Sequence, residues 1–232
     1  MRERKGELFL IAGFTGLVAT LFLAFNWVPS VNINAFESPE AQRIFYWHVP
    51  AAWAAFISFS VLFAGSAMWL FKRNEFGWKL HIAGSEAGLA CGLIAVWSGC
   101  IWGAAEWGTP WDWQDYRLNS FALLTLLALF LVLGRRSQPD GVESRDTFAT
   151  FGFYGFVLVP FTYLVTRIWV IRHPGPIIAG DDASSISLEM RLAFYVGVIS
   201  FTLMVIGHII TSVQITRFEQ RIDRLQGIID GE

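Results

Sequence analysis

Long apolar stretches alternate with short polar breaks along the whole chain. A helix needs about 20 mostly apolar residues to cross the hydrocarbon core of a bilayer, and six stretches approach or exceed that length. They lie at about residues 8–28, 46–71, 80–102, 118–134, 147–171 and 187–213. The two-residue alternation of a membrane β-barrel does not recur over many strands. The pattern therefore predicts an all-α integral membrane protein with six transmembrane helices, in a single domain that covers residues 1–232.

The composition supports a membrane protein and argues against other classes. Of the 232 residues, 54% are hydrophobic and 16% are charged, whereas soluble domains carry about 25% charged residues. The net charge is −2 and no basic face stands out, so we expect membrane lipid and no nucleic acid among the partners. Cys91 and Cys100 lie nine residues apart on one predicted helix, where they point to nearly opposite faces and cannot form a disulfide.

Lysine and arginine residues indicate how the helices cross the membrane. Twelve of them fall in the N-terminal segment, in the connections 72–79 and 135–146, and in the tail after the sixth span. The opposite connections and span ends hold five at most. Because cytoplasmic loops carry an excess of Lys and Arg, we expect both termini to be cytoplasmic and the connection between the third and fourth helices to face outward. The tail at 214–232 has apolar residues at helical spacing, which predicts a cytoplasmic amphipathic helix lying against the inner membrane surface or a partner subunit.

Five of the eleven tryptophans gather around this outer connection, within seventeen residues. They are Trp97, Trp102, Trp107, Trp111 and Trp113. Tryptophan is common at membrane interfaces, and anchoring is the simplest interpretation of any single one. An anchoring belt is spread over both interfaces and several helices, however. One contiguous segment on one side therefore favours an aromatic binding surface.

The predicted topology sorts the four histidines into two pairs. His48, at the outer end of the second span, and His173, after the fifth span, lie on the side of the tryptophans. His81 and His208 lie toward the cytoplasmic ends of their spans. Imidazoles ligate haem iron and indoles stack on the macrocycle, so the outer pair predicts a haem site, although a hydrogen-bonded helix-end residue is the alternative for either histidine alone. The candidate partners of the haem propionates are Arg43, Arg117 and Arg172.

Two motifs resemble those of a known family. The first lies at 102–120 and reads Trp-Gly-Ala-Ala-Glu-Trp-Gly-Thr-Pro-Trp-Asp-Trp-Gln-Asp-Tyr-Arg-Leu-Asn-Ser. It resembles the WWD signature of haem-handling proteins in cytochrome c biogenesis, and we place the WWD-type segment at 97–120. The second lies at 48–53, reads His-Val-Pro-Ala-Ala-Trp, and is similar to a motif of the haem exporter protein C (CcmC) family. The resemblance covers essentially the whole chain, and six spans also fit this family.

The resemblance implies a haem-handling protein and not an enzyme. Such a protein holds b-type haem non-covalently on the extracytoplasmic side of the cytoplasmic (inner) membrane and delivers it to a membrane-anchored haem chaperone (CcmE). An ABC-transporter-like complex and a small membrane subunit would be its other partners. His48 and His173 would be the axial ligands of the haem iron. The haem platform would consist of Trp102, Trp107, Trp111 and Trp113, with Asp115 and Arg117.

Three points stay open at the level of sequence. Gln114 separates Trp113 from Asp115, so the aspartate of the signature could be either Asp112 or Asp115. The runner-up function is a membrane b-type cytochrome acting as an oxidoreductase subunit, which would use His81 and His208 for a second haem or an electron path. A structural subunit of a transporter, in which the tryptophans only anchor the helices, is the third interpretation.

Overall fold

The computed structural model describes residues 4–31, 37–168 and 186–230, and the regular elements within them are all helical. Six helical segments are long and apolar enough to cross a membrane, which confirms the predicted all-α architecture. The helices in chain order are α1 (Lys5–Asn26), α2 (Phe45–Lys72), α3 (Glu75–Trp107), α4 (Tyr116–Ser137), α5 (Val142–Tyr154), α6 (Leu158–Ile168) and α7 (Leu188–Asp230). The short 3-10 turn η1 (Pro39–Ile44) precedes α2, and η2 (Gly155–Val157) joins α5 to α6 within the fifth span.

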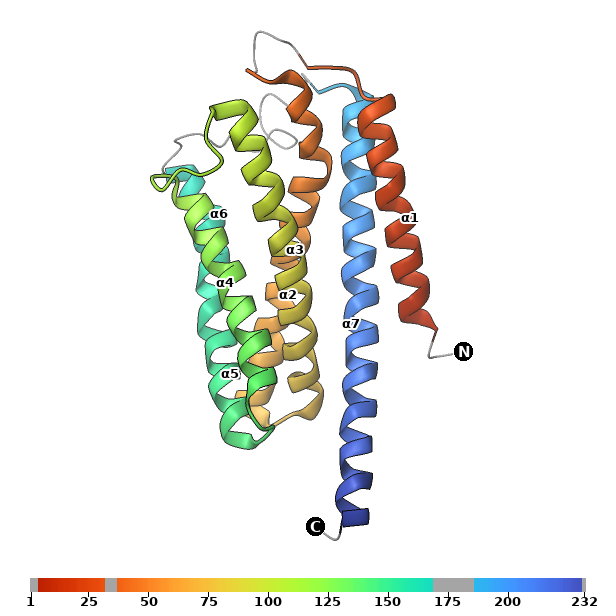
Figure 1. Cartoon of the computed structure of the whole chain (residues 1–232), viewed down its shortest axis with the longest axis vertical. Coiled ribbons are helices and arrows are strands. Elements are labelled where there is room, and N and C mark those ends of the chain that lie inside the picture. The colour runs from red at the N-terminus through yellow and green to blue at the C-terminus, as the bar shows by residue number, and fades with distance from the viewer. Residues whose placement is uncertain (1–3, 32–36, 169–185, 231–232) are drawn as a thin grey trace.

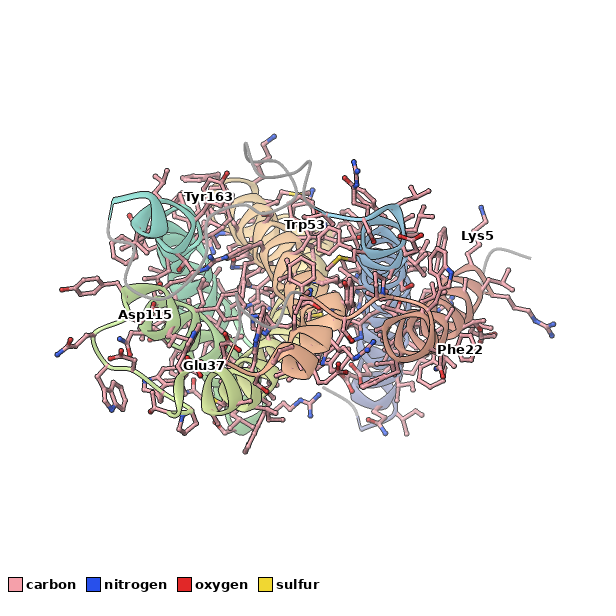
Figure 2. All side chains as sticks on the ribbon, turned by 90° about the horizontal axis from the view of Figure 1, so that it is seen from above. Lys5, Phe22, Glu37, Trp53, Asp115 and Tyr163 are labelled. Carbon is pink, nitrogen blue, oxygen red and sulfur yellow. The ribbon has the colours of Figure 1, made fainter. Side chains whose placement is uncertain are left out.

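Helices α2 and α3 form the centre of the bundle (Figure 1). One side of this pair is covered by α4, α5 and α6, and the other by α7, with α1 packed on the outside of α7. Seen from above, Asp115 and Glu37 lie toward the opposite side of the bundle from Lys5 and Phe22 of α1 (Figure 2). The central pair therefore carries most of the buried core, and the other helices are arranged around it.

Glycines allow the paired helices to approach closely. A Cβ atom built on Gly84 of α3 would lie 2.5 Å from the backbone nitrogen of Leu62 in α2. Between α1 and α7, a Cβ atom on Gly13 would lie 2.7 Å from the backbone nitrogen of Met204. Membrane helices associate through small residues of this kind because the surrounding lipid tails supply no hydrophobic driving force between them. Larger side chains at these positions would separate the helices of each pair.

The bundle has two chemically different ends (Figure 1). We call one the aromatic end; it holds η1, the last turns of α3 and the connection 108–115. We call the other the basic end; it holds the turn between α2 and α3, the turn between α4 and α5, and residues 214–230 of α7. Which end faces the cytoplasm stays a prediction from the distribution of Lys and Arg.

Two helices run further than the apolar pattern predicts. Helix α3 continues to Trp107, so the non-helical part of the tryptophan segment is confined to 108–115. Gly108 ends α3 with φ of 70°, a left-handed conformation that glycine adopts without strain. Helix α7 continues from the sixth span through the tail, which is therefore not a separate short helix. Neither glycine nor proline lies between Gly207 and Gly227 to interrupt it.

A polar cluster joins three helices on the side of the basic end. Glu86 of α3 accepts hydrogen bonds from Arg135 of α4 at 3.0 Å and from Ser212 of α7 at 2.9 Å. Arg136 Nη2 lies 3.4 Å from the same carboxylate, and His208 Nε2 of α7 lies 3.7 Å from it. This intramembrane carboxylate therefore ties α3 to both of its neighbours.

Candidate functional site

His48 lies in the first turn of α2, at the aromatic end, and is half-buried. Pro50 follows within the helix and has no N–H to donate to the carbonyl of Tyr46. Gly197 of α7 approaches that carbonyl so closely that a Cβ atom on it would lie 2.5 Å from the oxygen. The turn that carries His48 is thus packed against α7 on one side, and the imidazole of His48 contacts α3 on the other.

The tautomer of His48 follows from its hydrogen bond to α3. The Nδ1 atom of His48 lies 3.0 Å from Oγ of Ser98. Ser98 Oγ in turn donates to the backbone carbonyl of Ile94 at 2.6 Å. Because a hydroxyl group has a single proton, Ser98 accepts a hydrogen bond from the Nδ1–H group of His48. In the neutral imidazole the lone pair then lies on Nε2, which is the nitrogen that would bind a metal ion.

Two residues of α3 close to Ser98 fix the position of the imidazole ring of His48. The rings of His48 and Trp102 lie with centroids 5.9 Å apart and planes at 82°. A Cβ atom on Gly99 would lie 3.0 Å from Cε1 of His48, so a larger residue there would push the ring aside. One face of α3 therefore supplies a hydrogen-bond acceptor, the space for the ring and an aromatic wall.

A small cavity of ≈ 50 Å³ lies beside this imidazole, between α2, α3 and α4. His48, Trp111 and Arg117 provide its polar groups, and the apolar side chains of Phe56 and Phe121 also line it. The guanidinium group of Arg117 forms no ion pair with a described residue. A histidine and a cation from two different helices thus share one opening.

Two indole N–H groups in this region have no acceptor in the part of the chain that the structure describes. The Nε1 atoms of Trp102 and Trp111 are buried, and no described residue accepts a hydrogen bond from either. Buried donors are nearly always satisfied, and an unpaired one calls for an explanation such as a water or another ligand. These two indole groups contact His48 or share its cavity, which is also lined by Arg117, a cation that interacts electrostatically with Asp115.

The two candidate aspartates of the signature have different structural roles. Asp115 is buried and caps α4, because its side chain accepts from the backbone N–H groups of Arg117 at 2.9 Å and Leu118 at 3.1 Å. Asp112 is half-buried and accepts from the backbone N–H of Gln114 at 2.9 Å, which forms a local turn. Asp115 therefore determines where α4 begins and orients the turn that carries Arg117.

The remaining platform tryptophans lie further from His48. Trp113 is 80% exposed, and its ring centroid lies 5.8 Å from that of Trp111. Trp107 is half-buried in the last turn of α3, where a Cβ atom on Gly103 would lie 3.2 Å from its ring. Of the four predicted platform residues, Trp102 and Trp111 are the ones that contact His48 or share its cavity.

Arg43 is engaged in structural contacts at the aromatic end. Its guanidinium group pairs with Glu40 at 2.6 Å and donates to the carbonyl oxygens of Ala24 and of Val28, the latter at 3.3 Å. These bonds tie η1 to the end of α1, and only 15% of the Arg43 side chain is exposed. Arg172 and His173 lie outside the described residues, so their proximity to His48 stays a prediction.

Sequence reasoning did not identify several residues that build this site. Ser98 and Gly99 lie in an apolar span, where small residues usually indicate helix packing. Glu106 of α3 accepts hydrogen bonds from the backbone N–H groups of Glu37 at 3.1 Å and Ser38 at 3.0 Å, and so connects the start of η1 to α3. The sequence around Glu106 does not indicate that its side chain would bond to residues 37 and 38.

The inner histidines contact different neighbours. His81 is fully buried, stacks on Trp78 with ring centroids 4.7 Å apart, and has its Nδ1 atom 2.9 Å from Oγ of Ser66. His208 belongs to the cluster around Glu86. These surroundings are typical of packed polar residues that join helices.

Comparison with known proteins agrees with the motifs. Residues 4–227 match the family model described as "Heme exporter protein C". Proteins of that name are 33% identical over 132 residues in Rhodobacter capsulatus, covering 57% of this chain and 52% of the relative, and 26% identical over 191 residues in Bradyrhizobium diazoefficiens, covering 82% and 72%. The Escherichia coli K12 protein is 34% identical over 165 residues, covering 68% and 65%. The chain thus spans about half the length of the Rhodobacter relative. Since the family model extends over nearly the whole sequence, the chain belongs to the haem exporter protein C (CcmC) family.

Proposed function

We propose that this chain binds b-type haem non-covalently at the aromatic end and delivers it to a membrane-anchored haem chaperone (CcmE) during cytochrome c maturation. An ABC-transporter-like complex and a small membrane subunit would be its further partners. The family name supports haem as the cargo. We infer that the protein is a transport component of the cytoplasmic (inner) membrane rather than an enzyme.

The observation that carries the proposal is the combination of an oriented histidine with two unsatisfied indole donors and a cation beside it. The hydrogen bond from Nδ1–H of His48 to Ser98 directs the Nε2 lone pair to iron, as the outer hydrogen bonds of metal-binding histidines commonly do. The buried N–H groups of Trp102 and Trp111 have no acceptor among the described residues, and the guanidinium group of Arg117 lines the cavity beside His48. A haem presents both the iron and two anionic propionates, so it would satisfy the histidine and the donors at once.

The size of the cavity favours delivery over permanent storage. Its volume of ≈ 50 Å³ is well below the roughly 300–1,000 Å³ of pockets that enclose small-molecule ligands. Haem would therefore lie against the opening with much of the macrocycle outside it. The exposed indole of Trp113 would extend the aromatic surface on which the macrocycle lies. An acceptor protein could then approach the exposed edge of the haem.

The second axial ligand in this proposal is His173, with Arg172 as a further propionate partner. The connection that carries both follows α6, whose last described residues reach the aromatic end of the bundle. Arg117 is a stronger candidate than Arg43 for the propionate, because the Arg43 guanidinium group is already bonded to Glu40 and to two carbonyl oxygens.

The distribution of cations supports an outward-facing haem site. The cations Lys72, Arg73, Arg136 and those of the α7 tail all lie at the basic end, opposite the tryptophan segment 102–113. Cytoplasmic ends of membrane proteins are enriched in such residues. The haem would therefore be bound on the extracytoplasmic side, and both termini would be cytoplasmic.

The test is a visible absorption spectrum of the detergent-purified protein after co-expression with its maturation partners. We expect bound haem in the parent chain, and loss of most of it in His48→Ala and in His173→Ala. His208→Gln is the matched control, because it alters a histidine at the other end and should keep the haem spectrum. A normal spectrum in the double variant of His48 and His173 would refute the site, and loss in the His208 variant alone would favour the cytochrome alternative.

A further inference from the structure

A second cavity, of ≈ 880 Å³, lies at the basic end of the molecule. It opens between the start of α1, the start of α3 and the part of α7 that follows the sixth apolar stretch. Five of its lining side chains are cations, namely Lys5, Lys79, Arg217, Arg221 and Arg224. They come from three helices that are far apart in sequence, so the folded chain concentrates a charge that no single segment carries.

Cations outnumber carboxylates around this cavity: Lys79 interacts electrostatically with Arg217, Arg224 and Arg145, and with one carboxylate, that of Glu75. The residues that line the cavity include no Asp or Glu, and none of its five cations forms an ion pair with a described residue. Glu75, at the start of α3, instead pairs with Arg145 at 2.9 Å. The Nε2 atom of Gln220 lies 3.4 Å from Glu75, which holds α7 beside α3 at this level. Like charges around one cavity repel each other and attract an anion.

The depth of the cavity corresponds to the boundary between apolar helix surface and water. Lys5 is the first residue of α1, and Lys79 lies one turn into α3, just before its apolar stretch. Ile210 and Phe218 of α7 line the cavity together with the cations. Below this level α7 extends beyond the rest of the bundle (Figure 1). An occupant of this site must therefore combine an anionic group with an apolar part.

We propose that this cavity binds the headgroup of an anionic phospholipid, with the phosphate between Lys79 and Arg217 and the acyl chains directed along the apolar surface toward Ile210. Basic clusters next to membrane helices attract anionic lipids in this way, and Lys and Arg side chains reach the headgroup level while their stems stay apolar. The lipid would bridge α1, α3 and α7. Its binding is independent of haem, so the two sites can be tested separately.

The experiment measures lipid retention by native mass spectrometry of the full detergent-purified chain. The parent is offered phosphatidylglycerol and phosphatidylcholine with the same acyl chains in equal amounts, and we expect a preference for phosphatidylglycerol. In the double variant Lys79→Gln/Arg217→Gln this preference should fall about 25-fold, since each cation removed weakens it about fivefold. Lys72→Gln removes a cation at the same end but outside the cavity and should leave the preference unchanged.

A charge-preserving variant and a competition with inorganic phosphate complete the experiment. The charge-preserving variant Lys79→Arg/Arg217→Lys should keep the preference, which separates loss of charge from loss of folding. Inorganic phosphate at the same concentration as the lipid should not displace it. Equal retention of the two lipids by the parent, an unchanged preference in the double Gln variant, or displacement by inorganic phosphate would each overturn the proposal of a phospholipid site.

Discussion

The hydroxyl group of Ser98 on α3 accepts a hydrogen bond from Nδ1 of His48 on α2, across 3.0 Å. The same hydroxyl donates its proton to the carbonyl of Ile94 one turn earlier. The direction of the hydrogen bond is therefore determined by the helix backbone, and the Nε2 atom of His48 carries the lone pair. A serine in an apolar span thus determines which imidazole nitrogen could bind iron.

Removal of this acceptor should weaken haem binding without removing the ligand. Outer hydrogen bonds to metal-binding histidines affect affinity by about 10–100-fold, so Ser98→Ala should raise the Kd for haem about tenfold in a spectroscopic titration. Ser98→Thr keeps the hydroxyl group and should restore most of the affinity. Ser60→Ala is the matched control, because Ser60 lies exposed on α2 and donates only to Phe56. An unchanged Kd in Ser98→Ala would show that the tautomer of His48 does not matter for binding.

The two arginines of the aromatic end should respond differently to substitution. Arg117→Gln removes a charged donor from the cavity beside His48, and hydrogen bonds to charged groups contribute about 1.5–3 kcal/mol, so the Kd for haem should rise at least about tenfold. Arg43→Gln instead removes the link between η1 and α1 and should lower the thermal unfolding midpoint with a smaller change in haem affinity. The reverse order of effects on haem affinity would identify Arg43 as the propionate partner.

The indole N–H groups can be removed while the aromatic ring is kept. Trp102→Phe and Trp111→Phe each delete one donor that has no acceptor among the described residues. A neutral hydrogen bond contributes about 0.5–1.5 kcal/mol, so each variant should bind haem several-fold more weakly, as measured by the same titration. Trp97→Phe, at a position that is 68% exposed on α3, should bind as the parent does. Parent-like binding in both site variants would mean that these donors do not contact the haem.

The number of spans and the proximity of His48 to the tryptophan segment can be predicted from the sequence, because both depend on the order and length of whole apolar stretches. Apolar length predicts six spans, and the same topology places His48 near the tryptophan segment. The ends of the helices are less predictable. The Trp-rich and acidic composition of 103–117 suggests a loop, yet residues 103–107 continue α3 until Gly108 stops it.

Contacts between distant segments cannot be predicted from the distribution of apolar and polar residues along the chain. Ser98 and Gly99 look like packing residues until His48 is placed against them. The basic cavity is not predictable from single helices for the same reason, since Lys5 of α1 and Lys79 of α3 join the arginines of α7 only in the folded chain. Such features depend on which helix faces meet, and the composition of a single helix does not specify that.

The two candidate aspartates can be separated by stability. Loss of an N-cap side chain costs about 0.5–2 kcal/mol, so Asp115→Ala should lower the thermal unfolding midpoint and, by loosening the first turn of α4, weaken haem binding through Arg117. Asn also caps helices well, so Asp115→Asn should recover most of both properties. Asp112→Ala removes a local turn contact and no helix cap, so it should have a smaller effect on stability. If Asp112→Ala abolishes haem binding while Asp115→Ala does not, Asp112 is the functional aspartate.

The carboxylate of Glu86 should contribute to stability without affecting the haem site. Glu86→Gln leaves Arg135, with 21% of its side chain exposed, without its counter-charge. Breaking a buried pair costs about 3–5 kcal/mol, and partial exposure reduces this to about 1–3 kcal/mol, which would be measured as a lower thermal unfolding midpoint in detergent. The double variant Glu86→Gln/Arg135→Gln should regain much of that loss, because Arg136, the arginine then left without Glu86, is largely exposed to solvent. Arg136→Gln, with 65% of the side chain exposed, is the control and should change little.

Haem affinity should stay at the parent level in all three variants, because the cluster around Glu86 lies away from the aromatic end. The stability of the double variant tests the role of the ion pair. If the double variant is no more stable than Glu86→Gln alone, the ion pair with Arg135 is not the source of the stabilisation.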